Sequence, residues 1–204
     1  MSIRFGATDT WANTSEGTFH QVFRLVGGLA PNTSGMTLVS ATVGPFRAGT
    51  GAGALPIRVA VYSGGSANNP SGATLVEDLG SVQPASGSYA MYTRTSSISP
   101  TIPANQYLWI AVKSDSVNDG TEGLLLRTRS DNTNSGDLSS TAGRVNSAGE
   151  TNGVSAATAF PSTLAGSMST GSLWYGWSLI YTVGGGGSSS TPAFGRYGVR
   201  GPIR

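Results

Sequence analysis

Hydrophobic and polar residues alternate most clearly in residues 55–62, Leu-Pro-Ile-Arg-Val-Ala-Val-Tyr. Successive side chains of a strand point to opposite faces, so this pattern predicts a β-strand with one buried face. The run of Ser, Gly, Asn and Pro at 63–72 predicts a turn, and a second apolar segment follows at 73–79. We therefore expect two adjacent strands here.

The same pattern recurs along the chain. Further strands are expected at residues 18–25, 36–43, 89–95, 98–102, 107–113, 123–129 and 172–183. Both faces of residues 107–113 are apolar, which predicts a central strand buried on both sides. Residues 130–171 carry a weak pattern, for which we expect a hairpin or a loop ordered by a neighbour.

About nine short strands, with no helical periodicity, predict an all-β chain. We expect a two-sheet antiparallel β-sandwich at residues 18–183, jelly-roll-like, after a polar N-terminal segment at 1–17. The shared alternation places one set of side chains in a single core: Ile57, Val59, Val61, Leu108, Ile110, Val112 and Leu179.

Few charges are present, because Asp, Glu, Lys and Arg make up 11% of the 204 residues, against about 25% in an ordinary soluble domain. Repulsion between copies is therefore weak, which suits dense packing in an assembly. Residues 1–184 have a net charge of −1, and the last twenty residues add three arginines and no acid. The sandwich has no basic stripe for phosphates, so we expect no nucleic-acid partner.

The end of the chain differs from the sandwich. Residues 184–190 form a Gly/Ser linker, which spans about 15 Å as a random coil. Residues 191–204 alternate apolar anchors with arginines, and we interpret them as an extended C-terminal arm that binds a partner; the alternative is an unstructured terminus. The expected contact residues are Phe194, Arg196, Tyr197, Val199, Arg200, Ile203 and Arg204.

Two stretches carry a family resemblance. Ile57-Arg58-Val59-Ala60-Val61-Tyr62, with its following Gly/Asn/Pro loop and residues 75–81, resembles a recurring jelly-roll module, and so does the aromatic-rich segment at 101–112. Similar modules occur in bacteriophage head and tail proteins and in bacterial surface proteins. The likeness covers about residues 35–183. It implies a binding or structural role and supplies no catalytic residue.

Candidate catalytic chemistry is sparse. His20 is the only histidine and there is no cysteine, so a Ser-His-Asp triad would depend on His20, and no Gly-x-Ser-x-Gly motif accompanies it. We expect His20 to be a strand residue and the protein not to be an enzyme. A thiolate or histidine zinc site lacks ligands.

Calcium is the one cofactor that the sequence leaves open. Two oxygen-rich segments contain Asp115 and Asp119 in the first and Asp131 and Asp137 in the second. Neither follows the EF-hand spacing, and Asp, Asn and Gly are also the ordinary residues of turns, so we expect no bound metal.

Aromatic residues offer a second binding hypothesis. Trp109, Trp174 and Trp177, with Tyr107 and Tyr175, could form a platform for sugar rings. Stacking on a sugar needs exposed rings, whereas rings that alternate along a strand usually fill the core. We favour the core.

These observations predict a non-enzymatic structural protein that docks through its termini on other proteins and on copies of itself. The resemblance to bacteriophage modules implies that it is a virion protein, a phage capsid decoration protein bound to other virion proteins. The alternative is a carbohydrate-binding module of a tail fibre or surface protein. The first residues lack the apolar run of a secretory signal, and no segment approaches the ~20 apolar residues of a membrane helix. We therefore expect synthesis in the host cytoplasm, location in the virion and no membrane partner.

Overall fold

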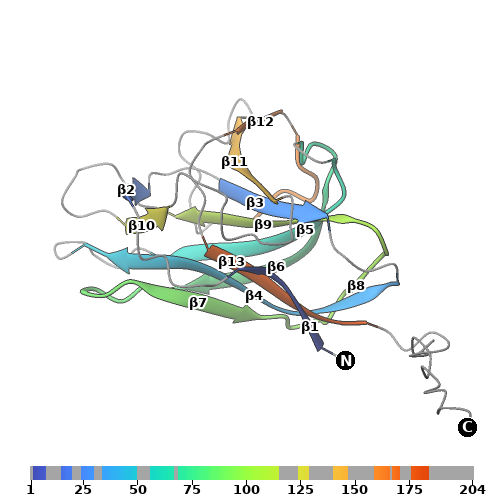
Figure 1. Ribbon diagram of the computed structural model, residues 1–204, viewed down its shortest axis with the longest axis horizontal. Coiled ribbons are helices and arrows are strands. Elements are labelled where there is room, and N and C mark those ends of the chain that lie inside the picture. Colours follow the sequence, from blue (N-terminus) through green and yellow to red (C-terminus); the bar gives the residue numbers. More distant parts are fainter. Residues whose placement is uncertain are drawn as a thin grey trace, which may run out of the picture.

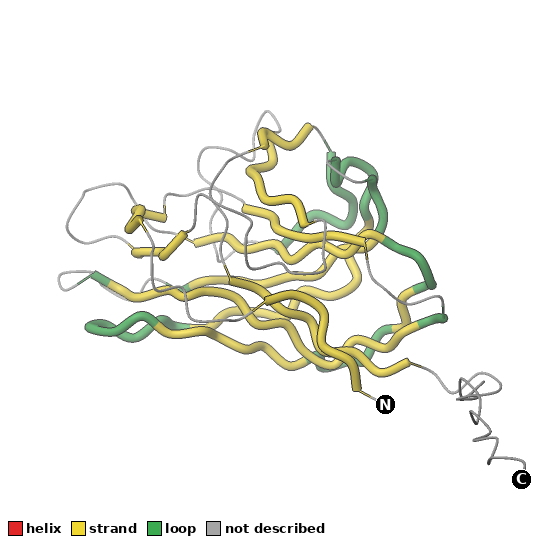
Figure 2. The backbone as a smooth tube through the Cα atoms, viewed as in Figure 1, coloured by secondary structure: helices red, strands yellow, loops and turns green. Residues whose placement is uncertain are grey.

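A computed structural model describes residues 2–7, 15–19, 24–29, 34–49, 56–66, 69–114, 124–128, 140–146, 159–165, 167–170 and 176–183. This described part consists of strands and loops, without a helix (Figures 1 and 2). The strands are β1 (Ser2–Ala7), β2 (Ser15–Phe19), β3 (Arg24–Leu29), β4 (Met36–Ala48), β5 (Ile57–Ser63), β6 (Thr74–Val82), β7 (Ala90–Thr95), β8 (Thr101–Ile102), β9 (Tyr107–Ser114), β10 (Leu124–Thr128), β11 (Ser140–Asn146), β12 (Ser167–Thr170) and β13 (Gly176–Val183).

The strands form two antiparallel sheets that pack face to face as a sandwich (Figure 1). Sheet A has the order β1-β13-β4-β10-β2, and β7 and β8 also pair with β4. Sheet B has the order β12-β11-β3-β9-β5-β6. Phe46 of β4 lies between Ala90 of β7 and Leu126 of β10, so β10 follows β13 along one side of β4.

Eight strands make up the jelly roll. Sheet A contains β1-β13-β4-β7 and sheet B contains β3-β9-β5-β6 as two four-stranded layers. The chain changes sheet between successive members of this set, except from β5 to β6, which form a hairpin. This is the arrangement of an eight-stranded jelly roll, and the predicted fold class is confirmed. The C-terminal arm at 191–204 lies outside the described residues.

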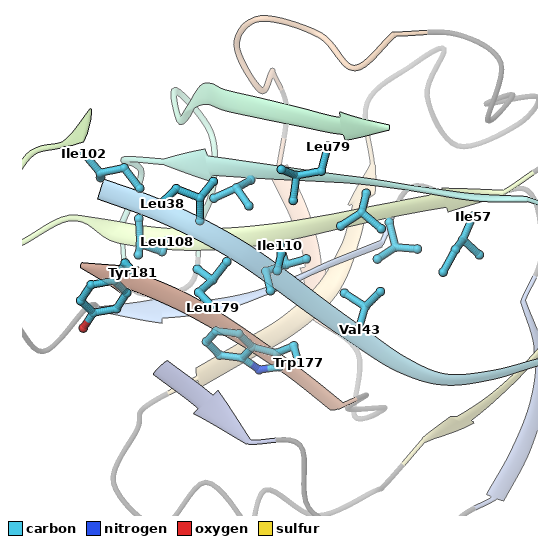
Figure 3. Packing of buried hydrophobic residues seen from close by; sticks show 14 of the residues in the cluster. Leu38, Val43, Ile57, Leu79, Ile102, Leu108, Ile110, Trp177, Leu179 and Tyr181 are labelled. Carbon is cyan, nitrogen blue, oxygen red and sulfur yellow. The ribbon is translucent and has the colours of Figure 1, made fainter. Parts of the chain in front are cut away.

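The main core lies between the sheets, as Figure 3 shows. Alternate residues of β5 and β9 point into it from sheet B, and residues of β4 and β13 meet them from sheet A, because side chains on one strand face recur every second residue. The seven core residues expected from the alternation all belong to this cluster: Ile57, Val59, Val61, Leu108, Ile110, Val112 and Leu179.

Tyr181 of β13 is the polar exception in the main core. Its side chain is buried, its hydroxyl has no hydrogen-bond partner in the described part of the chain, and burial raises the pKa of the phenol. Leaving a buried donor unpaired costs about 1–3 kcal/mol. We expect Tyr181→Phe to keep or raise the free energy of unfolding, by up to about 1 kcal/mol in urea titrations. A decrease of more than about 1 kcal/mol would reveal a partner for the hydroxyl.

A second core covers the outer face of sheet B. Its side chains come from β3, β5 and β9, from Ala73 and from the segment 159–165, which we call the strap. Tyr62 donates a hydrogen bond to the carbonyl of Pro161 (2.8 Å), and its ring meets that of Phe160 edge to face at 6.3 Å. β5 is therefore buried on both faces, and the prediction of a single buried face is wrong. The prediction that β9 is buried on both faces is confirmed.

Strand boundaries differ from the prediction in three places. The expected strand at 18–25 is divided, because β2 pairs in sheet A and β3 in sheet B. Gly27 lies inside β3, where a Cβ atom would overlap the carbonyl oxygen of Leu108, so only glycine fits this contact. β4 continues through the cis Gly44–Pro45 bond to Ala48, beyond the predicted end of the strand at residue 43.

The weakly patterned segments also pair. Within the predicted N-terminal segment 1–17, β1 lies beside β13 along its full length. In the region 130–171, β11 and β12 pair antiparallel, in line with the hairpin that was one of the two expectations there. Both segments thus extend the sheets of the sandwich.

Candidate functional site

The structure describes only part of the residues that the sequence suggested for binding. The calcium candidates Asp115, Asp119, Asp131 and Asp137 lie outside the described residues, as do His20, Trp174, Tyr175 and the arm residues 191–204. Among the residues that are described, no group of three or more His, Cys, Asp or Glu side chains could hold a metal ion. Within the described part of the chain, no helix is present that is long and apolar enough to cross a membrane.

The sugar-platform hypothesis is wrong for two of its three tryptophans. Trp109 is fully buried in the outer-face core, where its indole N–H donates to the carbonyl of Gly64 at 2.9 Å. Trp177 is 4% exposed and belongs to the main core. Neither ring presents a face to solvent, because aromatic rings that alternate along these strands fill the layers on both sides of the sheets. Tyr107 is half-buried and stacks on Trp109.

Two neighbouring acids of β6, Glu77 and Asp78, point to opposite faces of sheet B. Asp78 forms a two-point ion pair with Arg58 of β5, with both nitrogen–oxygen distances at 2.9 Å. Its carboxylate also accepts the backbone N–H of Gly80 and, at 3.4 Å, that of Phe160 in the strap. Asp78 therefore links sheet B to the strap.

Lys113, the only lysine of the chain, holds the same strap from β9. Its side chain is buried, its ammonium group donates to the carbonyl of Ala159 at 3.1 Å, and it lies 4.5 Å from the centre of the Phe160 ring. A buried cation needs such partners, since an unpaired charge inside a protein is costly. These polar groups are therefore structural anchors of the strap.

Glu77 faces the edge between the two sheets. One carboxylate oxygen accepts the hydroxyl of Ser96, and the other accepts the backbone N–H (2.7 Å) and hydroxyl (2.8 Å) of Ser97. Nearby, Arg94 of β7 donates to the carbonyl of Leu79, the extra residue of a bulge in β6. Side chains thus close an edge at which β6 and β7 form no ladder.

The turn at 96–99 is fixed by these contacts. The hydroxyl of Ser96 also accepts the backbone N–H of Ser99, whose φ of 49° is rare for a residue other than glycine. At the tip, Ile98 is 69% exposed, and it is the one large hydrophobic side chain so exposed among the described residues. The turn therefore presents a single apolar side chain on a rigid support.

Because of Glu77, we expect the free energy of unfolding to decrease in acid. Burial raises its pKa, but hydrogen bonds from Ser96, Ser97 and the N–H of Ile98 together outweigh burial, so the pKa lies below its ordinary value of 4.5. A depressed folded-state pKa stabilises the fold above the unfolded pKa, and this contribution is lost as pH falls through the folded value.

We expect Glu77→Gln to lower the free energy of unfolding by about 1.5–3 kcal/mol at pH 7, because hydrogen bonds to a charged acceptor are lost. The difference from the parent protein should shrink as pH falls from 5 to 3 in urea titrations. A difference independent of pH would mean that the charge of Glu77 contributes nothing.

Both described ends of the chain lie at one end of the sandwich. Ser2 pairs with Thr182 across β1 and β13, Val183 pairs with Met36 of β4, and Met36 pairs with Ile102 of β8. We call this end the terminal pole; Figure 1 marks the N-terminus there. The turn that carries Ile98 leads directly into β8, so it belongs to the same region.

A groove with a volume of about 480 Å³ opens at the terminal pole, between β6 of sheet B and the segment around β8. Its lining is neutral and mixes polar with apolar groups, without a charged side chain. Residues that line it include Ser63, Val76, Pro100, Thr101, Pro103 and Gln106. Such a lining suits a neutral ligand or a peptide better than a charged one, and no acid–base pair lies among the lining residues.

Sequence reasoning missed Glu77, Asp78 and the groove. A pair of carboxylates inside an otherwise apolar strand was an available indication, since buried acids require partners. The identity of those partners depends on contacts with residues 94–97 and 159–160, which no local pattern predicts.

Comparisons with protein-family models, with curated proteins and with solved structures found no match.

Proposed function

We propose that the chain is a non-enzymatic virion structural protein, a phage capsid decoration protein that docks on neighbouring subunits through its termini. The observation that carries the proposal is the pairing of Ser2 with Thr182, which brings both ends of the jelly roll to one pole. The arm that follows β13 and the N-terminal strand β1 can then contact the same neighbour, while the opposite pole stays free for display.

The amino-acid composition of the chain supports this role. Few charges and many Ser, Thr, Asn and Gly residues allow copies to pack closely without strong repulsion. The arm adds Phe194 and Tyr197 as apolar anchors and three arginines that can hold carboxylates in bidentate contacts. Other virion proteins and further copies of the chain are the proposed partners. The burial of Trp109 and Trp177 disfavours the carbohydrate-binding alternative.

Deleting residues 185–204 is expected to leave the melting temperature within about 2 °C, because no described core residue is removed, and to abolish binding to the assembled shell. The measurement is co-sedimentation with particles assembled from the products of neighbouring genes. In a matched control, the Gly/Ser linker is replaced by a different linker of the same length and the arm is kept. This variant should bind the particles normally. If the truncated protein still occupies the particles fully, the docking surface must lie on the sandwich and not on the arm.

A further inference from the structure

We propose that the groove at the terminal pole is the acceptor for residues 191–204 of the same chain, which it holds before a neighbouring subunit takes them. The inference rests on the proposed role of the arm and adds the place where the arm is held in the free protein. Four observations carry it: where the chain leaves the sandwich, an open strand edge, a rigid wall and the neutral lining.

The chain leaves the sandwich close to the groove. Val183, Met36 and Ile102 lie side by side on three neighbouring strands, and Thr101 and Pro103 on either side of Ile102 line the groove. Two strand spacings of ~4.8 Å make this distance roughly 10 Å. The linker 184–190 spans about 15 Å as a random coil. A short flexible linker that covers the distance gives its segment a local concentration in the millimolar range.

The groove also offers an unpaired strand edge. The N–H of Leu38 donates to the carbonyl of Pro100 at 3.0 Å, and Met36 lies opposite Ile102. Hydrogen-bonded and non-hydrogen-bonded pairs alternate in an antiparallel ladder, so the N–H and C=O of Thr101 point away from β4. In the described part of the chain, β8 pairs with β4 alone. An extended peptide can add to such an edge.

One wall of the groove is rigid before any ligand binds. Pro100 follows the turn that Glu77 holds through Ser96 and Ser97, and the N–H of Ser96 donates to the carbonyl of Val39 at 2.7 Å. A preformed site lowers the ordering cost of binding. Most of the conformational entropy lost on binding is then that of the arm. Burial of the arm's apolar anchors must offset this cost.

The neutral lining of the groove favours contact with the apolar residues of the arm over contact with its arginines. Phe194 and Ile203 suit the Pro and Val side chains of the groove, and no charged lining residue is available to pair with Arg196, Arg200 or Arg204. Seated in this way, the arm keeps its arginines exposed for the acidic groups of a neighbour. Exchange of the arm from its own groove to that neighbour would couple release to assembly.

Because the chain has no cysteine, a disulfide can test the placement in the full-length protein. The test variant carries Gln106→Cys in the groove and Ala193→Cys in the arm. The control carries Ser88→Cys and Ala193→Cys; Ser88 is exposed and follows Ser86, which bridges Ala48 at the far end of β4 from Met36. Thirteen residues of β4 separate the two ends by roughly 40 Å.

Mild oxidation of dilute protein should give an intrachain disulfide in the test variant at least tenfold faster than in the control, after correction for the reactivity of each thiol. Adding Thr101→Pro to the test variant removes the backbone N–H that points away from β4, and an edge strand tolerates proline. This change should slow the reaction several-fold. Equal rates in test and control, no effect of Thr101→Pro, or disulfides formed only between chains would each overturn the inference.

This outcome is separable from that of the proposed function. Slow crosslinking with normal binding of the full-length chain to particles would reject the groove and leave terminal docking intact. Fast crosslinking, with particle binding unaffected by removal of the arm, would reject terminal docking and leave the groove as the site of the arm.

Discussion

Val59→Asp is expected to leave no cooperatively folded protein at 25 °C. Val59 lies at the centre of β5, has no exposed surface and packs between the sheets in the main core. The residues of this cluster are hydrophobic and offer no partner to a carboxylate at position 59. The cost of burying such a charge exceeds the 5–15 kcal/mol by which native domains are stable.

The matched control is Ser81→Asp. Ser81 is exposed on the neighbouring strand β6, opposite Arg58, so the same new charge faces water and should change the free energy of unfolding by no more than about 0.5 kcal/mol. Thermal melts followed by near-ultraviolet circular dichroism distinguish the two variants. A cooperative transition in Val59→Asp within a few degrees of the parent would contradict the core described here.

Trp109→Ala is the second large effect, with an expected loss of about 3–5 kcal/mol in the free energy of unfolding. The ring is fully buried beneath the strap, and its N–H satisfies the carbonyl of Gly64. Truncation leaves a cavity in the outer-face core and an unpaired acceptor. Urea unfolding at equilibrium measures the loss.

Tyr62→Phe serves as the comparison for Trp109→Ala, because it removes only the hydroxyl that donates to the strap and should cost about 1 kcal/mol. A loss below about 1 kcal/mol for Trp109→Ala would mean that the ring lies outside the core. The sugar-platform hypothesis would then apply again to this residue.

The main core could be predicted from the sequence because its determinant is local. Ile57, Val59 and Val61 alternate with residues of the other face, and a period of two fixes which side chains share a face regardless of the partner strand. Leu108, Ile110 and Val112 follow the same rule, and they meet the first set because β5 pairs with β9.

The outer-face core could not be predicted in this way. Tyr62 and Ala60 are buried by Phe160 and Leu164, which lie about a hundred residues later in a segment without a strand pattern. Whether the second face of a strand is covered depends on whether such a distant segment packs against it. The Glu77 contacts depend likewise on the meeting of two sheet edges, and the groove on the position of β8 beside β6.

The most direct measurement for the proposed function is an electron cryomicroscopy reconstruction of particles assembled from the neighbouring gene products with the full-length chain. We predict a jelly roll bound with its terminal pole, marked by Ser2, Ile98 and Val183, against the shell, and with the far end of β4 near Ala48 pointing outward. A reconstruction in which the far end contacts the shell, or particles that carry no copy of the chain, would contradict docking through the termini.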